Sequence, residues 1–127
     1  MTWSYKDDSD NLHSVYPGMT QMDMYNGIAG AVQTEVLPLK DISFVIPAGT
    51  AVQNARATSL GDTLIGDDNV HLNALGDYVA GLTWFAKLTG MSIDNITYTP
   101  NTDIANKLDT IKKAVKDAIA NPFAVTK

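Results

Sequence analysis

Ile42-Ser43-Phe44-Val45-Ile46 is a short run of β-branched and aromatic residues that ends at Pro47. A continuous apolar run of this length is typical of a strand buried on both faces of a parallel sheet. Such a strand needs neighbours, because its backbone N–H and C=O groups must find partners on both edges. Residues 2–5 offer one further, fragmentary strand. The sequence therefore predicts an α/β fold in which this chain supplies only part of a sheet.

Apolar residues at helical spacing predict three helices around this strand. The first is opened by the capping pattern of Thr20 and Asp23, the second by Asn73, and the third by a proline. The predicted helices cover residues 20–37, 73–89 and 100–121, and Gly90 is expected to end the second. Between residues 47 and 73 the sequence shows little periodicity apart from a helical turn at 50–56. Long irregular segments often carry function, so the chemistry is sought there.

The composition limits the function classes. The chain has 127 residues, of which 45% are hydrophobic and 18% charged, which fits one domain with a real core. The formal net charge of -5 argues against nucleic acid as a partner. No apolar run predicts a membrane segment or a signal peptide. The absence of cysteine excludes disulfides and thiolate zinc sites, and it leaves the cellular compartment open.

Asp68 and His71 form the pattern that points to chemistry. A spacing of three in a loop before a helix lets the carboxylate reach the imidazole Nδ1–H, which leaves Nε2 free to act as a general base. The plain alternative is a turn-forming aspartate beside an exposed histidine, and Asp67 is the fallback acid. Asp67, Asp68 and His71 are too few ligands for a convincing metal site, so no metal or cofactor is predicted. His13 is expected to be a solvated loop residue.

The segment Asp68-Asn69-Val70-His71-Leu72 resembles the Asp-x-x-His-Leu block in the C-terminal part of the SGNH (GDSL-type) hydrolases. Residues 45–56 and 60–64 look like one bacterial branch of that superfamily, originally grouped as a domain of unknown function. The resemblance covers most of residues 20–123. It implies a three-layer α/β/α sandwich, of which this chain would hold the helices and one or two parallel strands. It also implies hydrolysis of esters or acetyl groups by a Ser-His-Asp triad.

The family's nucleophilic serine lies in a Gly-Asp-Ser motif after the first strand, and that block is not found here. Gly61-Asp62-Thr63 follows a polar loop and is not accepted as the motif. Residues 1–127 are therefore expected to be the C-terminal part of one hydrolase domain, inactive alone. A missing N-terminal segment or a second copy of the chain would be its partner. The substrate implied by the resemblance is an acyl ester or an acetylated carbohydrate.

Two further residues are candidates for substrate binding. Arg56, the only arginine, either lies at the rim of the pocket or braces a loop, and Asn54 either contacts substrate or holds loop backbone. The rival hypothesis is a non-catalytic α/β module that self-associates or binds a partner. A split enzyme should show exposed strand edges and a cleft with His71 near Asp68, whereas a module should be a monomer with covered sheet edges.

Overall fold

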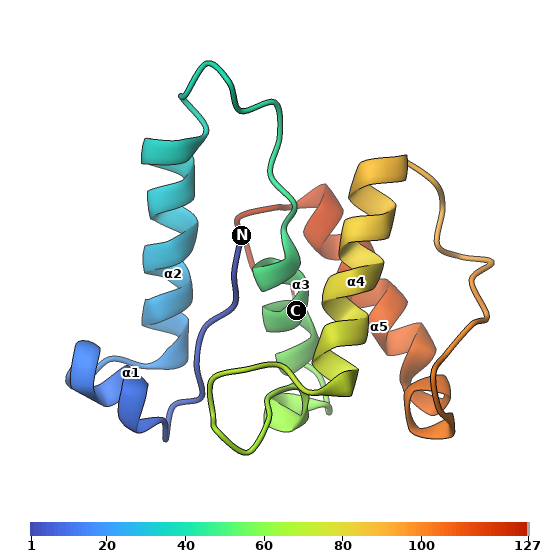
Figure 1. The fold of residues 1–127 in the computed structure, drawn as a ribbon, viewed down its shortest axis with the longest axis horizontal. Helices are drawn as coiled ribbons and strands as arrows, with labels where there is room; N and C mark the ends of the chain where they lie inside the picture. The colour runs from blue at the N-terminus through green and yellow to red at the C-terminus, as the bar shows by residue number, and fades with distance from the viewer. Residues whose placement is uncertain (127) are drawn as a thin grey trace.

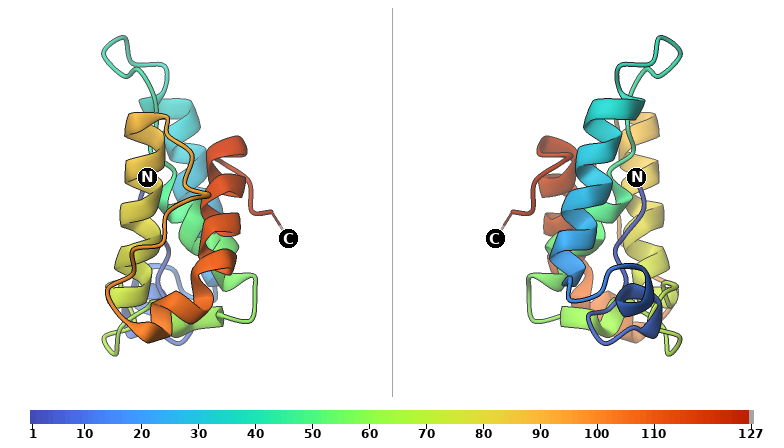
Figure 2. Two further views of the ribbon diagram at one scale, coloured as in Figure 1. Left: turned by 90° about the vertical axis from the view of Figure 1, so that its right-hand side faces the viewer. Right: turned by 90° about the vertical axis from the view of Figure 1, so that its left-hand side faces the viewer.

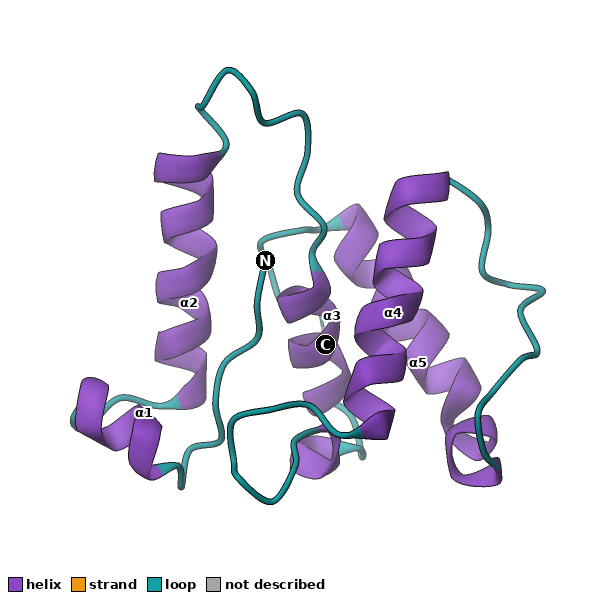
Figure 3. Ribbon diagram, in the orientation of Figure 1, coloured by secondary structure: helices purple, strands orange, loops and turns teal. Residues whose placement is uncertain are grey.

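The computed structural model describes residues 1–126, which form an array of helices joined by loops (Figure 1). The elements are α1 (Asp10–Val15), α2 (Gln21–Ala31), the π-helical turn η1 (Val32–Val36), α3 (Ala48–Arg56), the 3₁₀ turn η2 (Gly61–Leu64), α4 (Ala74–Thr89) and α5 (Thr102–Ala120). Figure 3 shows no strand in this part of the chain. Its only ladder pairing is an isolated antiparallel bridge between Ile65 and Leu72. No helix within residues 1–126 is both long enough and apolar enough to cross a membrane.

The core lies where α3, α4 and α5 pack against one another. All nine residues of α3 are buried, because alanine and glycine let its neighbours approach closely on several sides. Helix α5 is amphipathic and directs its apolar stripe, which includes Ile104, Ile111 and Val115, into the same core.

The N-terminal segment, residues 1–6, runs between α2 and α3 (Figures 1 and 2). The Met1 amino group donates to the Ile46 carbonyl, and the Gly49 amide donates to the Met1 carbonyl, both at 2.9 Å. A Cβ on Gly49 would lie 1.7 Å from the Thr2 carbonyl oxygen, so only glycine permits this approach. The N-terminal segment is thus fixed to the start of α3.

The α/β prediction is wrong for the described residues, which hold helices but no sheet. Residues 42–46 lie in a loop, their contact with residues 1–6 does not continue into a ladder, and Phe44 is 49% exposed. A segment rich in β-branched and aromatic residues becomes a strand only when a partner segment completes its backbone hydrogen bonds. Residues 1–126 contain no such partner for residues 42–46. The expected parallel strands and exposed strand edges are therefore not found here.

All three predicted helices are present in the structure. The helices at 73–89 and 100–121 are confirmed as α4 and α5, with Asn73 as N-cap and Gly90 in the left-handed region at the end of α4. The helix at 20–37 is confirmed as α2, although its last turn is π-helical. The helical turn predicted at 50–56 is part of the longer α3. Helix α1 was missed, because its polar sequence indicated a loop, and Ser9 caps it.

Candidate functional site

The candidate site is the loop between η2 and α4. The Gly66 amide donates to the His71 carbonyl at 2.8 Å, and the Asn69 amide donates to the Gly66 carbonyl at 3.0 Å. Asn69 adopts a left-handed backbone with φ of 63°, a conformation that asparagine tolerates better than most residues. These bonds fold residues 66–71 into a compact turn.

The turn brings Asp68 and His71 into direct contact. Asp68 Oδ2 lies 2.6 Å from His71 Nδ1, while Asp68 Oδ1 accepts the backbone amides of His71 at 2.9 Å and Val70 at 3.0 Å. An ionised carboxylate only accepts hydrogen bonds, so Nδ1 carries the proton of this contact. In the neutral imidazole, Nε2 is then the acceptor nitrogen, which is the form that a general base requires.

The electrostatics of the turn keep Asp68 ionised. The backbone hydrogen bond from His71 is the main cause that lowers the pKa of the Asp68 carboxyl to about 2, followed by the bond from Val70 and the side-chain bond from His71. Both side chains face solvent, with 78% of His71 and 54% of Asp68 exposed. The pair is therefore accessible to a group brought up from outside the turn.

The start of α4 supports the same loop. The Asn73 side chain caps the helix by accepting the amides of Leu75 and Gly76, and its Nδ2 donates to the Thr63 carbonyl at 2.8 Å. A Cβ on Gly76 would lie 2.4 Å from the Leu64 carbonyl oxygen. The backbone before the loop and the first turn of α4 are thus in contact.

Sequence reasoning missed the contribution of the N-terminal segment. The Trp3 indole Nε1 donates to the Val70 carbonyl at 3.0 Å, and the Lys6 amide donates to the Asn69 carbonyl at 3.0 Å. Both bonds join residues more than 60 positions apart, and no local pattern in the sequence signals such contacts.

Arg56 lies inside the protein and braces the N-terminal segment. Its Nη1 donates to the Ser4 carbonyl at 2.8 Å and to the Ser4 hydroxyl at 3.0 Å, and its Nε lies 2.9 Å from Asp62 Oδ1. Burial lowers the pKa of the guanidinium, which the nearby Asp62 carboxylate partly opposes. Its loop-bracing role is therefore visible, and none of these contacts reaches the Asp68–His71 pair.

Asn54 also has backbone partners. Its Nδ2 donates to the Ala114 carbonyl at 3.2 Å, and its Oδ1 accepts the Thr126 amide at 2.8 Å. The buried amide thus ties α3 to α5 and to the C-terminal segment, as expected of an asparagine that holds backbone.

The other candidates make no contact that joins them to the pair. Asp67 is exposed beside Asp68, while the Thr63 hydroxyl donates to the Leu60 carbonyl at 2.7 Å within η2. His13 is exposed on α1. Within residues 1–126, no three histidine or acidic side chains are grouped closely enough to hold a metal ion.

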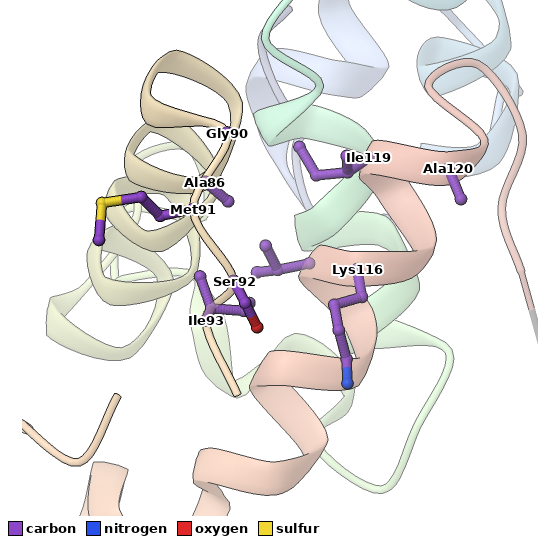
Figure 4. Close-up of a pocket in the computed structure, with 9 residues that line it drawn as sticks. Ala86, Gly90, Met91, Ser92, Ile93, Lys116, Ile119 and Ala120 are labelled. Carbon is purple, nitrogen blue, oxygen red and sulfur yellow. The ribbon is translucent and has the colours of Figure 1, made fainter. Parts of the chain in front are cut away.

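An apolar hollow lies at the opposite end of α4. Its volume is about 380 Å³, and it is lined by Gly90, Met91 and Ile93 on one side and by Val115, Lys116 and Ile119 of α5 on the other (Figure 4). Helix α4 has 16 residues and spans about 24 Å at 1.5 Å per residue, so this hollow is remote from His71.

The fold and the site together define a helical domain with an exposed aspartate–histidine pair on the loop before α4, a helix that packs one face into the core. The model of the family described as "Domain of unknown function (DUF4886)" matches residues 1–118, and the chain belongs to this family. It is similar to the crystal structure of a DUF4886 family protein from Bacteroides uniformis ATCC 8492, with a TM-score of 0.85 and 32% sequence identity. The match covers 98% of this chain and 48% of the solved one, so this chain spans about half the length of that relative. No curated protein matches the chain.

Proposed function

We propose that this chain carries the base and the orienting acid of a serine hydrolase that cleaves esters, in a catalytic triad of the SGNH type. The observation that carries this proposal is the 2.6 Å contact between Asp68 Oδ2 and His71 Nδ1. The resemblance of residues 68–72 to the Asp-x-x-His-Leu block supports the same reading. Acyl esters and acetylated carbohydrates are the proposed substrates.

In this mechanism His71 Nε2 takes the hydroxyl proton of a serine as the serine oxygen attacks the ester carbonyl. The tetrahedral intermediate collapses to an acyl-serine, and His71 returns the proton to the departing alcohol. Water then attacks the acyl group, with His71 accepting its proton and giving it back to the serine. Asp68 stays ionised throughout and stabilises the imidazolium.

The serine would come from a segment other than residues 1–127. The solved relative is about twice as long as the region it shares with this chain, which leaves room for such a segment in family members. The 78% exposure of the His71 side chain leaves the imidazole accessible to it.

The test is hydrolysis of p-nitrophenyl acetate by a full-length family protein that contains this sequence. We expect His71→Ala to lower kcat by roughly 10⁴-fold or more, because a triad loses proton transfer when its histidine is removed. His13→Ala is the matched control, since it removes an exposed histidine on α1, and it should leave kcat unchanged. The 127-residue chain alone should show no His71-dependent hydrolysis. Retained activity in His71→Ala would refute the proposal.

A second candidate is a non-catalytic binding module. Trp84 and Leu88 are 52% and 57% exposed, and their spacing of four residues places them on one stripe of α4. Exposed apolar stripes of this kind mark surfaces that bind another protein or another copy. A full-length protein that hydrolyses no ester would favour this candidate.

A further inference from the structure

The backbone on both sides of Val70 is held from two directions. A peptide unit is planar, and in the trans form its C=O and N–H point to opposite sides. The unit that joins Val70 to His71 accepts the Trp3 indole N–H on its carbonyl and donates its amide to Asp68 Oδ1. The preceding unit, which joins Asn69 to Val70, accepts the Lys6 amide and donates to the same carboxylate oxygen.

Both peptide planes therefore lie between the N-terminal segment and the Asp68 carboxylate. If either plane rotated about its ends, its amide would leave Asp68 Oδ1, and the carboxylate would lose part of the scaffold that aims Oδ2 at His71 Nδ1. Hydrogen bonds in series also polarise one another, so a donor on the carbonyl strengthens the bond made by the amide of the same unit.

The N-terminal segment is itself a firm anchor. It is joined to the start of α3 through Met1 and Gly49, and the buried Arg56 guanidinium holds the Ser4 carbonyl at 2.8 Å. Trp3 is half-buried and packs against the core formed by α3, α4 and α5. The turn that carries the exposed pair is thus connected through Trp3 to the most buried part of the molecule.

We propose that Trp3 is a positioning residue for the Asp68–His71 pair. Its indole N–H fixes the Val70–His71 peptide plane and so keeps the Asp68 carboxylate directed at His71 Nδ1. The inference rests on the proposed hydrolase function. Trp3 acts through the backbone and Asp68, and it makes no contact with the substrate in this role.

The experiment compares Trp3→Phe with wild type and with Trp84→Phe in the 127-residue chain. Phenylalanine keeps an aromatic ring at position 3 and removes only the indole donor, and Trp84 is the matched control because its ring is half-exposed on α4. The readout is the pH titration of the Asp68 carboxyl carbon by NMR. We expect its midpoint, about 2 in wild type, to rise by up to about one pH unit in Trp3→Phe, because a weakened amide bond no longer favours the ionised form. Trp84→Phe should leave the midpoint in place.

An unchanged Asp68 midpoint in a folded Trp3→Phe variant overturns the inference. If that variant fails to fold, hydrogen exchange of the indole N–H groups in wild type decides the matter. The Trp3 indole should exchange at least tenfold more slowly than the Trp84 indole, and equal rates overturn the inference.

In the full-length protein, Trp3→Phe should lower kcat for p-nitrophenyl acetate by about twofold to tenfold with KM unchanged, which is the range expected for one lost hydrogen bond. Loss of hydrolysis in His71→Ala together with normal kcat and a normal Asp68 midpoint in Trp3→Phe would refute only the role of Trp3. Full hydrolysis in His71→Ala would instead refute the proposed function.

Discussion

Replacing glycine with alanine should have opposite effects on stability at two positions of α4. Gly76 lies in the first turn, where a Cβ would sit 2.4 Å from the Leu64 carbonyl oxygen and 2.8 Å from the Leu72 Cδ2. Gly81 lies in the exposed middle of the helix, and nothing is found within 4 Å of its Cβ position. Replacing each with alanine therefore changes the same atoms in two very different surroundings.

The magnitudes follow from these surroundings. Alanine is favoured over glycine inside a helix by about 0.5–1 kcal/mol, so Gly81→Ala should raise the free energy of unfolding by that amount. At Gly76 the new methyl meets a backbone oxygen that cannot rotate away, and overpacking of this kind costs about 1–3 kcal/mol. Part of this cost is offset by helix propensity. We therefore expect Gly76→Ala to destabilise the chain by about 1–2 kcal/mol.

Urea unfolding followed by circular dichroism measures both changes. The midpoint should rise for Gly81→Ala and fall for Gly76→Ala with a common slope, because neither variant alters the area exposed on unfolding. A Gly76→Ala chain as stable as Gly81→Ala would refute the contact between the first turn of α4 and residue 64. It would also remove one of the supports of the loop that carries His71.

Two predictions concern buried and exposed charge. The Asp68 carboxyl should titrate near pH 2 in the folded chain and near its ordinary 3.8 in urea. Since the folded pKa is the lower one, the stabilisation by Asp68 should be present above about pH 3.8 and disappear as the pH falls through 2; equal midpoints in both states would contradict the backbone bonds to its Oδ1. Arg56→Lys should lower the free energy of unfolding by about 1–3 kcal/mol, because one ammonium cannot replace the fork that reaches both Ser4 and Asp62. Both this variant and its control, Lys87→Arg at a half-buried position of α4, are measured by urea unfolding. An Arg56→Lys variant as stable as wild type would argue against the contacts of the guanidinium with Ser4 and Asp62.

The sequence predicted the helices well because their signals are local. The caps at Thr20 and Asn73 and the stop at Gly90 each act within one turn, and they lie at the ends of the helices in the structure. The sheet could not be judged in this way. Residues 42–46 have the composition of a buried strand, but strand formation depends on a second segment with free hydrogen-bonding groups, and residues 1–126 do not supply one.

The same distinction applies to the candidate site. The contact between Asp68 and His71 spans three residues, so spacing alone indicated it, and the carboxylate does lie at Nδ1. Its catalytic role stays a prediction. The donors from Trp3 and Lys6 are distant in sequence and could not be read from it. The same holds for Arg56 and Asn54, whose partners lie mainly in segments far from α3.

These local and distant contacts together orient His71, the proposed general base. The turn aligns Asp68 with His71 without any group from the rest of a longer protein, and the N-terminal segment fixes that turn to the core. A base that is already oriented loses little further conformational freedom when a nucleophile is brought to it, which is one source of efficient catalysis. The geometry of the pair can therefore be studied in this chain by titration, while the proposed hydrolysis is measured in a full-length family protein. If Trp3→Phe changes both the titration of Asp68 and the kcat for hydrolysis relative to wild type, the geometry of the turn is linked to the chemistry proposed for it.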